Sequence, residues 1–268
     1  MSTNILSYGG DNTGNNDNSA AFSSAYAALP EKGGAIYFPA GRYKFEKQVI
    51  LNIGPLEKIT IYGDGSDSTV FYWPNGEGLS LINTSTDVSQ NGTADVRDVS
   101  FETGNVNVGT ALTLGASEGN ASQGRALSNI ERVSFRGSSY VSNNCWSYGL
   151  TIAISYVNVV DCSFTGSPSL QGTGISIVGA TAPSYVVVSN IDRCSFFCHN
   201  FGVEAFAYTQ GLNINQSNFV SCNAGVANPP NATGLVQFTI MGNQFGDIKN
   251  SAILLNTAVP GTILSSNV

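Results

Sequence analysis

The sequence has few charged residues, and most of them are acidic. Only 11% of its 268 residues are Asp, Glu, Lys or Arg, and the net charge is -7 at pH 7, whereas roughly a quarter of an average globular protein is charged. The few basic residues form no stripe that could meet a phosphate backbone, so we expect no nucleic-acid partner. Because 42% of the residues are hydrophobic, the chain can fill a core and is not expected to be disordered.

Long apolar segments, histidine and paired cysteine motifs are also scarce. No apolar run approaches the roughly 20 residues of a membrane-spanning helix, so we expect no membrane insertion. The single histidine, His199, and the lack of a CxxC pair argue against a zinc site, and we expect no metal or other cofactor. Five cysteines favour buried free thiols over disulfides. The segment Met1–Ile5 lacks a basic start and an apolar region, so a secretory signal is not expected.

A six-residue pattern recurs along the C-terminal two thirds of the chain. Each copy starts with Val or Ile, has a small residue at the fourth position and, until the last copy, ends with Phe. The copies begin at Val96, Ile130, Val159, Ile191, Ile214, Ile240 and Ile263, and they end at Phe101, Phe135, Phe164, Phe196, Phe219, Phe245 and Val268.

This repeat predicts a solenoid of stacked β-strands. A supersecondary unit this short cannot bury its apolar face alone, but stacked units can, with strands about 4.8 Å apart. The last three positions of each copy are expected to form a strand, and the polar second and third positions a bend. We therefore predict a parallel β-solenoid with Phe stacked inside and with insertions at about 103–108, 137–148 and 165–173. A second column, Asn200, Asn223 and Asn250, predicts an asparagine ladder at a recurrent turn.

The first 45 residues differ from the repeat. Asp17-Asn18-Ser19 offers helix N-cap residues, and the segment 20–29 is a good helix former that ends before Pro30. A helix at this place would cover the open end of a solenoid core. We therefore divide the chain into an N-terminal cap with a helix and first strand, residues 1–45, and β-solenoid coils, residues 46–268.

Motifs in this region resemble the start of the pectate-lyase-like right-handed parallel β-helix superfamily, especially its bacteriophage tailspike and tail-fibre type. They are Tyr8-Gly9-Gly10-Asp11, Gly33-Gly34, Phe38-Pro39-Ala40-Gly41-Arg42-Tyr43 and Ile59-Thr60-Ile61-Tyr62-Gly63-Asp64-Gly65. The resemblance implies an all-β fold, a right-handed parallel β-helix with a short N-terminal capping α-helix. The superfamily also includes polysaccharide lyases and glycoside hydrolases, but the Asn-Thr-Asp and His-Gly motifs of polygalacturonase-type hydrolases are missing here.

Three carboxylates are candidate catalytic residues: Glu204, Asp161 and Asp192. Glu204 is aligned with small residues on neighbouring coils, which leaves room for a sugar beside a possible general acid; the alternative is a solvated glutamate. Asp161 and Asp192 stand in the bend of the repeat, and paired carboxylates there would suit glycosidase chemistry. The alternating charges of Asp98, Arg132, Asp161 and Arg193 favour instead a ladder of ion pairs between coils.

Four aromatic residues are candidate sugar-binding residues, because the C–H faces of sugars pack on rings. Tyr140, Trp146 and Tyr148 lie in the predicted insertion 137–148, and Tyr208 lies near another coil edge. The alternative is that these rings cover the side of the solenoid. His199 is interpreted as a turn residue.

These features lead to three competing hypotheses. The first is a bacteriophage tailspike or tail-fibre β-helix in the virion tail that binds, and in some such proteins degrades, host surface polysaccharide. The second is a bacterial polysaccharide lyase or hydrolase, secreted or on the cell surface, and the third is a structural virion component without a sugar site. The last repeat copy has no cap after it, so we expect a homotrimer, contacts with other tail proteins, and residues 238–268 near a subunit or domain contact.

Overall fold

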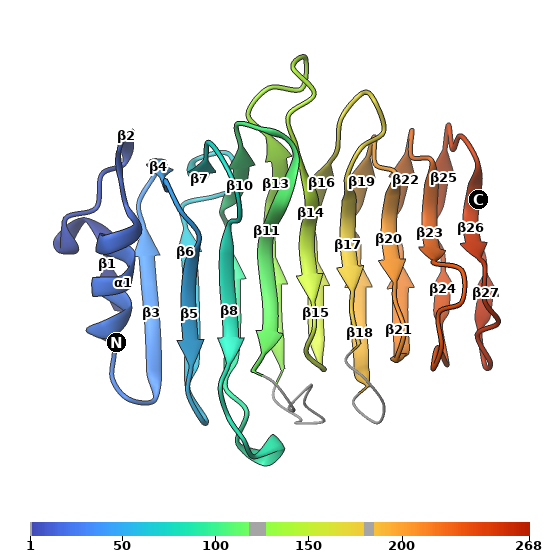
Figure 1. Cartoon of the computed structure of the whole chain (residues 1–268), viewed down its shortest axis with the longest axis horizontal. Coiled ribbons are helices and arrows are strands. Elements are labelled where there is room, and N and C mark those ends of the chain that lie inside the picture. The colour runs from blue at the N-terminus through green and yellow to red at the C-terminus, as the bar shows by residue number, and fades with distance from the viewer. Residues whose placement is uncertain (1, 118–126, 180–184) are drawn as a thin grey trace.

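The computed structural model describes residues 2–117, 127–179 and 185–268. Its strands stack side by side along one axis, and each turn of the chain adds one strand to each of three parallel sheets (Figure 1). The fold is a right-handed parallel β-helix, as the sequence predicts. Within the described residues, no helix combines the length and the apolar character that a bilayer crossing requires.

Sheet A contains the first position of every repeat copy. Its described strands pair in parallel and in register, so that Val96, Ile130, Val159 and Ile191 lie beside one another. The strands are β1 (Ser2–Asn4), β3 (Gly33–Phe38), β6 (Lys58–Gly63), β9 (Thr93–Arg97), β12 (Ser128–Glu131), β15 (Val157–Val160), β18 (Val186–Asp192), β21 (Thr209–Asn215), β24 (Thr239–Met241) and β27 (Ile263–Ser265).

Sheet B contains the phenylalanine that ends every copy but the last. Its strands are short, and the phenylalanine sits in the middle of the three-residue strands with its ring directed into the core. The strands are β2 (Thr13–Asp17), β4 (Gly41–Lys44), β7 (Thr69–Trp73), β10 (Ser100–Thr103), β13 (Ser134–Gly137), β16 (Ser163–Thr165), β19 (Ser195–Phe197), β22 (Asn218–Val220) and β25 (Gln244–Gly246).

Sheet C follows the longer loops and completes each coil. Buried aliphatic side chains alternate along its strands with outward-facing residues, as expected of a sheet with one face in the core. The strands are β5 (Val49–Ile53), β8 (Leu79–Asn83), β11 (Val106–Ala116), β14 (Cys145–Ile152), β17 (Thr173–Ile177), β20 (Phe201–Ala205), β23 (Ala224–Asn228) and β26 (Ser251–Leu255).

The phenylalanines of the repeat form a single stack, which confirms the prediction. Neighbouring rings lie nearly parallel, with centroids 4.7 Å apart for Phe135 and Phe164, 4.9 Å for Phe164 and Phe196, and 4.6 Å for Phe196 and Phe219. Phe245 continues the stack at 5.0 Å. Stacking is therefore set by the coil spacing, because the in-register sheets hold one ring above the next.

The third position of each repeat copy forms the bend between sheets A and B. Asp98, Arg132, Asp161 and Arg193 all have positive φ there, between 52° and 58°. Their side chains pair across coils as the alternating charges predict. Arg132 Nε lies 2.6 Å from Asp98 Oδ1, and Arg193 Nε lies 2.8 Å from Asp161 Oδ1.

Polar ladders and thiols also follow the stacking. Asn223 Nδ2 donates to Asn200 Oδ1 at 3.1 Å, which confirms a ladder between these two turns. A longer ladder that the sequence analysis missed crosses sheet A, where each amide donates to the preceding coil. It joins Asp95, Asn129, Asn158, Asn190 and Asn213. All five cysteines are free and buried, as expected.

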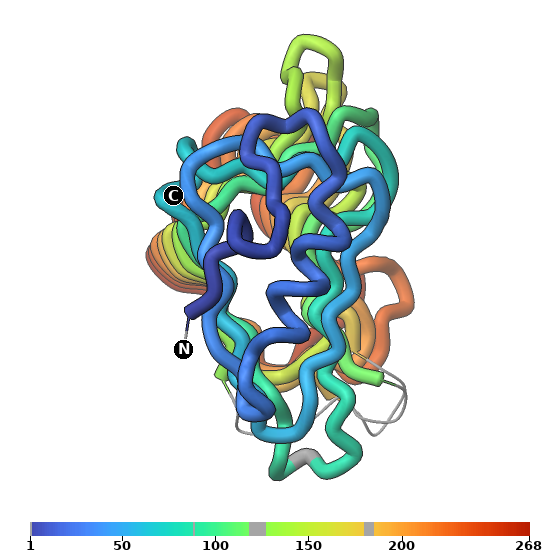
Figure 2. The backbone as a smooth tube through the Cα atoms, turned by 90° about the vertical axis from the view of Figure 1, so that its left-hand side faces the viewer, coloured from blue at the N-terminus to red at the C-terminus, as the bar shows by residue number. Residues whose placement is uncertain are grey.

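The N-terminal helix α1 (Ser19–Ala27) lies across the first coil (Figure 2). Asp17 Oδ1 accepts a hydrogen bond from the Ser19 backbone N–H at the start of the helix. Phe22 and Ala25 are fully buried, and the Phe22 ring packs edge-on against Phe38 at 5.0 Å. The helix thus covers the end of the core. Two short 3-10 helices lie elsewhere in the chain, at Ile5–Tyr8 and Val88–Gln90. Strands β1 to β4 of the first 45 residues continue the same sheets as the later coils.

Two sequence predictions about the repeat are wrong. The strand of sheet B covers the fifth to seventh positions rather than the fourth to sixth, because the fourth position follows the left-handed residue of the bend. In the last copy, Leu264 and not Ile263 pairs with Ile240. Val268 therefore occupies the exposed fifth position, and its side chain is 79% exposed.

Candidate functional site

A groove of about 390 Å³ runs over the outward face of sheet C, and we call it the Glu204 groove. It crosses β11, β14, β17 and β20, with its rim formed by the loops that enter sheet C. Its lining residues are Asn107, Ser147, Tyr148, Gly172, Thr173, Asn200, Phe201, Glu204 and Phe206. The groove brings together two residues that the sequence predicts as site residues, Glu204 and Tyr148.

Glu204 points into this groove from β20, one residue before the end of the strand. Its neighbours Val203 and Ala205 are fully buried in the core, so the alternation of the strand directs Glu204 outward. The register places it between Ser176 and Ala227 on the adjacent strands, as the alignment of the repeat predicts. These small side chains leave the carboxyl group room for a ligand.

Glu204 is largely buried although its side chain faces outward. The residue is 9% exposed, and its carboxylate has no ion-pair or hydrogen-bond partner among the described side chains. Burial disfavours the charged form and raises the pKa of Glu204 to about 7. The group can therefore exist as a neutral proton donor or as a carboxylate near neutral pH.

Gly172 holds the rim of the groove close to β14. Its φ is +79°, and a Cβ there would lie 2.3 Å from the Trp146 carbonyl oxygen. Only glycine fits this close approach, which fixes the loop that precedes β17. His199 lies directly before the lining residue Asn200 and is buried, and its burial lowers the pKa of the imidazole to about 4.

Asp161 and Asp192 lie away from Glu204, on adjacent coils, where the Asp161 backbone N–H donates to the Asp192 carbonyl oxygen at 3.2 Å. Asp161 lies in the bend between sheets A and B and accepts two hydrogen bonds from Arg193, which lower its pKa. Asp192 ends β18 in sheet A, where its Oδ1 accepts a hydrogen bond from Asn215 Nδ2 at 2.9 Å. Neither residue lines the Glu204 groove, so the structure does not assemble the three candidate carboxylates into one site.

The four candidate aromatic residues occupy four different environments. Tyr148 lines the Glu204 groove from β14. Trp146, on the same strand, is buried in the core, and its indole donates to the Phe101 carbonyl oxygen at 3.2 Å. Tyr140 stacks on Phe197 of sheet B, and Tyr208 lies edge-on to Tyr185 at the turn before sheet A.

The proposal that Trp146 binds sugar is therefore wrong. The predicted insertion 137–148 is shorter than expected, because Cys145–Ile152 forms strand β14. The alternation of this strand directs the Trp146 ring inward, where it packs against Trp73 at 6.1 Å. A buried indole presents no face to a ligand.

The Glu204 groove can bind sugar hydroxyls and supply one titratable proton. Phe201 and Phe206 were missed by the sequence analysis, although they flank Glu204 in the sequence. Together with Tyr148 they supply apolar surface, and the amides of Asn107 and Asn200 supply donors and acceptors. Among the described lining residues Glu204 is the only carboxyl group, and none is cationic. Within the described part of the chain, no group of three or more His, Cys, Asp or Glu could hold a metal ion.

Comparisons with known proteins agree with this architecture. A model of the rhamnogalacturonase A/epimerase, pectate lyase-like family matches residues 2–227, whereas a search of curated proteins found no match. The tailspike of phage phiAB6, solved in complex with three-repeated oligosaccharides of Acinetobacter baumannii surface polysaccharide, is 16% identical with a TM-score of 0.56, over 98% of this chain and 47% of the tailspike. Tailspike protein 3 of bacteriophage CBA120 is 16% identical with a TM-score of 0.52, over 98% and 48%. The chain thus spans about half the length of each tailspike.

Proposed function

Because the chain belongs to the rhamnogalacturonase A/epimerase family of pectate-lyase-like proteins, we propose that it binds a polysaccharide in the Glu204 groove. The observation that carries the proposal is the unpartnered carboxyl group of Glu204, a largely buried residue that lines the groove among aromatic and amide side chains. A neutral Glu204 donates a hydrogen bond to a sugar oxygen. Tyr148, Phe201 and Phe206 pack against the C–H faces of the sugar rings.

The biological setting that we propose is a bacteriophage tail. The ligand is then host cell-surface polysaccharide, and the partners are two further copies of the chain in a homotrimer and other tail proteins. The fold shared with two tailspikes supports this setting. The alternatives are a bacterial lyase or hydrolase that is secreted or lies on the cell surface, and a structural virion component without a sugar site.

Polysaccharide cleavage is a second candidate function, and the raised pKa of Glu204 favours it. In hydrolysis, neutral Glu204 would give its proton to the glycosidic oxygen as the C–O bond breaks, and water would add to the sugar carbon and return a proton to the Glu204 carboxylate. Glycosidases that follow this course use a second carboxylate. Glu204 is the only carboxyl group among the described lining residues, so binding is the function that this groove supports best.

The test of binding uses an array of bacterial surface oligosaccharides and two variants. We expect Glu204→Ala to weaken binding about tenfold at pH 6, because the hydrogen bond from the neutral carboxyl group to the sugar is lost. Glu204→Gln keeps an uncharged donor and should bind equally well at pH 6 and pH 8. Wild-type binding should weaken over this range, because the raised pKa of about 7 leaves Glu204 mostly protonated at pH 6 and mostly ionised at pH 8.

The matched control is Glu31→Gln, which changes an exposed glutamate outside the groove and should leave the binding curve unchanged. Wild-type affinity in Glu204→Ala at both pH values would remove this residue from the site. Release of reducing ends or unsaturated sugars by the wild type, and its loss in Glu204→Gln, would establish cleavage. Full cleavage by Glu204→Gln would direct the search to Asp161 and Asp192.

A further inference from the structure

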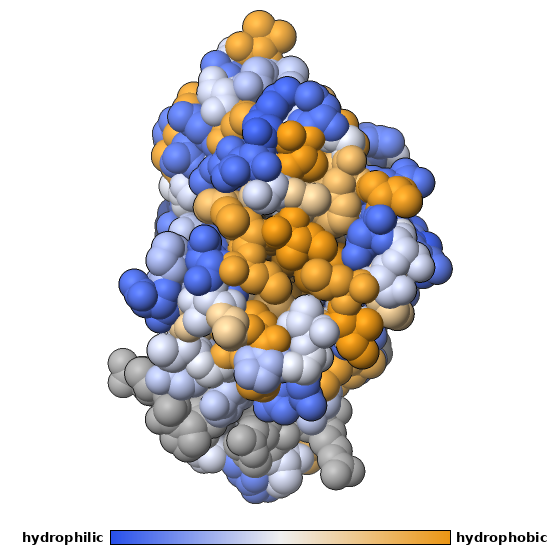
Figure 3. Space-filling view, turned by 90° about the vertical axis from the view of Figure 1, so that its right-hand side faces the viewer, coloured by the Kyte–Doolittle hydropathy of each residue, from blue (hydrophilic) through white to orange (hydrophobic). Residues whose placement is uncertain are grey.

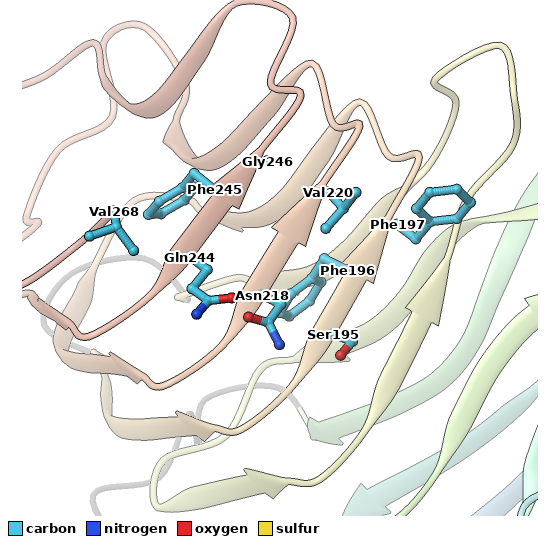
Figure 4. A pocket seen from close by; sticks show the side chains of 9 residues that line it. All are labelled: Ser195, Phe196, Phe197, Asn218, Val220, Gln244, Phe245, Gly246 and Val268. Atoms are coloured by element: carbon cyan, nitrogen blue, oxygen red, sulfur yellow. The ribbon is translucent and has the colours of Figure 1, made fainter.

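A second groove lies on the outward face of sheet B, on a different sheet from the Glu204 groove. It has a volume of about 580 Å³, and we call it the Phe197 groove (Figure 4). Its lining residues are Ser195, Phe196, Phe197, Asn218, Val220, Gln244, Phe245, Gly246 and Val268. None of them carries a charged side chain, in contrast to the Arg42–Glu102–Arg136 ion-pair cluster farther along the same sheet.

The short strands of sheet B line this groove with two rows of outward-facing residues. In β19, β22 and β25 the middle phenylalanine points into the core, so the first and third residues point outward. The first residues, Ser195, Asn218 and Gln244, form a polar row. The third residues, Phe197, Val220 and Gly246, form an apolar row, and the two rows lie on opposite sides of the groove (Figure 4).

The polar row has unused hydrogen-bonding capacity. The side chains of Asn218 and Gln244 are exposed, and neither makes a hydrogen bond to another described residue. The side-chain amides on sheet A, in contrast, hydrogen-bond to one another. Asn213 Nδ2, for example, donates to Asn190 Oδ1 at 2.8 Å. An amide offers both donors and an acceptor, so this row can bind the vicinal hydroxyl groups of a sugar.

The apolar row is extended by a ring from another coil. Phe197 is 39% and Val220 40% exposed. Tyr140, from the loop before β14, stacks on Phe197 with centroids 5.9 Å apart and planes inclined by 26°. Its hydroxyl group lies 3.3 Å from Cys198 Sγ, which holds the ring in place. Tyr140, Phe197 and Val220 therefore form a fixed apolar wall opposite the amides.

We propose that the Phe197 groove is a second polysaccharide-binding site, which takes a neutral segment of the glycan chain. The sugar packs its C–H face on Phe197 and Val220 and directs its hydroxyl groups to Asn218 and Gln244. Coils stack about 4.8 Å apart, a step close to the length of one sugar residue, so adjacent strands present the same pair of rows to successive sugars. The ligand class rests on the proposed function, but no residue of the Glu204 groove takes part.

The test is a titration of the whole chain with neutral hexasaccharides of glucose, mannose and galactose, followed by backbone amide chemical shifts. At least one probe should shift the amides of β19 and β22, and Glu204→Ala should not change that response. Phe197→Ala and Asn218→Ala should each weaken it about tenfold. The control Asn52→Ala changes an exposed asparagine on β5 and should leave it unaltered.

Absence of shifts on β19, β22 and β25 with every probe would overturn this inference, while binding of bacterial oligosaccharides that depends on Glu204 would still support the proposed function. Loss of both responses would overturn both proposals. A third outcome concerns a second copy of the chain as the occupant. If Phe197→Ala dissociates an oligomer of the wild type, as sedimentation would show, the groove is a subunit interface and the glycan site is refuted.

Discussion

Burial shifts the pKa values of two side chains in opposite directions. It raises the pKa of Glu204 to about 7 and lowers the pKa of His199 to about 4. The physical cause is the same, because the charged form of each group loses hydration in the folded chain. At neutral pH the imidazole is therefore uncharged, whereas Glu204 is divided between its two forms and can respond to small changes in pH.

His199 should make the folded chain less stable in acid. Well above pH 6.5, the ordinary pKa of histidine, the imidazole is neutral in both the folded and unfolded states and contributes nothing to the pH dependence. As the pH falls from 6.5 to 4, the unfolded chain binds a proton that the folded chain excludes. The free energy of unfolding should therefore fall by about 3 kcal/mol over this range through His199 alone.

This prediction is measured as a difference between proteins. Denaturant unfolding of the wild type and His199→Gln at pH 7, 5.5 and 4 separates the histidine from the carboxylates, which titrate in both. Because the chain has one histidine, no other imidazole contributes. A constant difference between the two proteins across this range would contradict the low pKa.

At the residue scale, sequence reasoning located Glu204 but not its environment. The repeat places it beside Ser176 and Ala227, and the register confirms that alignment. The groove around it also includes Asn107, from a strand three coils earlier, and Phe206, which no repeat aligns. A groove of this kind has no local sequence signal, because distant segments of the chain line it.

The phenylalanine column is the element that the sequence predicts best. Since each ring contacts the ring above and the ring below, Phe164→Ala removes two stacking contacts and leaves a cavity between coils. We expect the free energy of unfolding to fall by about 3–5 kcal/mol. Reversible denaturant unfolding measures the change.

The control for this substitution is Phe197→Ala, on the neighbouring strand of the same sheet. Phe197 points outward and is 39% exposed, so its removal should lower the free energy of unfolding by less than half as much. Equal losses in the two variants would mean that the in-register stack does not carry the stability of sheet B.

At the element scale, the repeat gives the wrong register where two neighbouring residues fit its first position equally well. Ile263 and Leu264 are both aliphatic, so either fits the first position, and in the structure Leu264 is the residue that pairs with Ile240. Asn267 then meets Asn243, and its Oδ1 accepts from the Asn243 backbone N–H at 3.1 Å. Spacing between aliphatic residues is a weaker indicator of register than such a polar contact.

The C-terminal face of the molecule is apolar at its centre (Figure 3). Phe245, Ile253 and Leu255 are only partly covered there, and Ile263 and Leu264 are 55% and 52% exposed. A strand edge with apolar side chains favours association. We therefore expect the chain of residues 1–268 to self-associate at micromolar concentration.

Light scattering of the wild type and of a double variant, Ile263→Ser with Leu264→Ser, tests this expectation. The variant should shift the mass toward the monomer, because the polar side chains reduce the apolar area available for contact. The exposed Ile50 at the other end of sheet C provides the control Ile50→Ser, which should leave the mass unchanged. A wild type that is monomeric at this concentration would contradict the prediction.

The helix that covers the first coil also suits folding that proceeds from the N-terminus to the C-terminus. A ribosome releases the N-terminal residues first, so α1 and the first coil emerge while the later repeats are still unmade. Each finished coil then presents three strand edges on which the next can pair in register. During synthesis, each new coil thus pairs with the coil made just before it. The chain therefore does not need the slow pairing of strands that are far apart in the sequence.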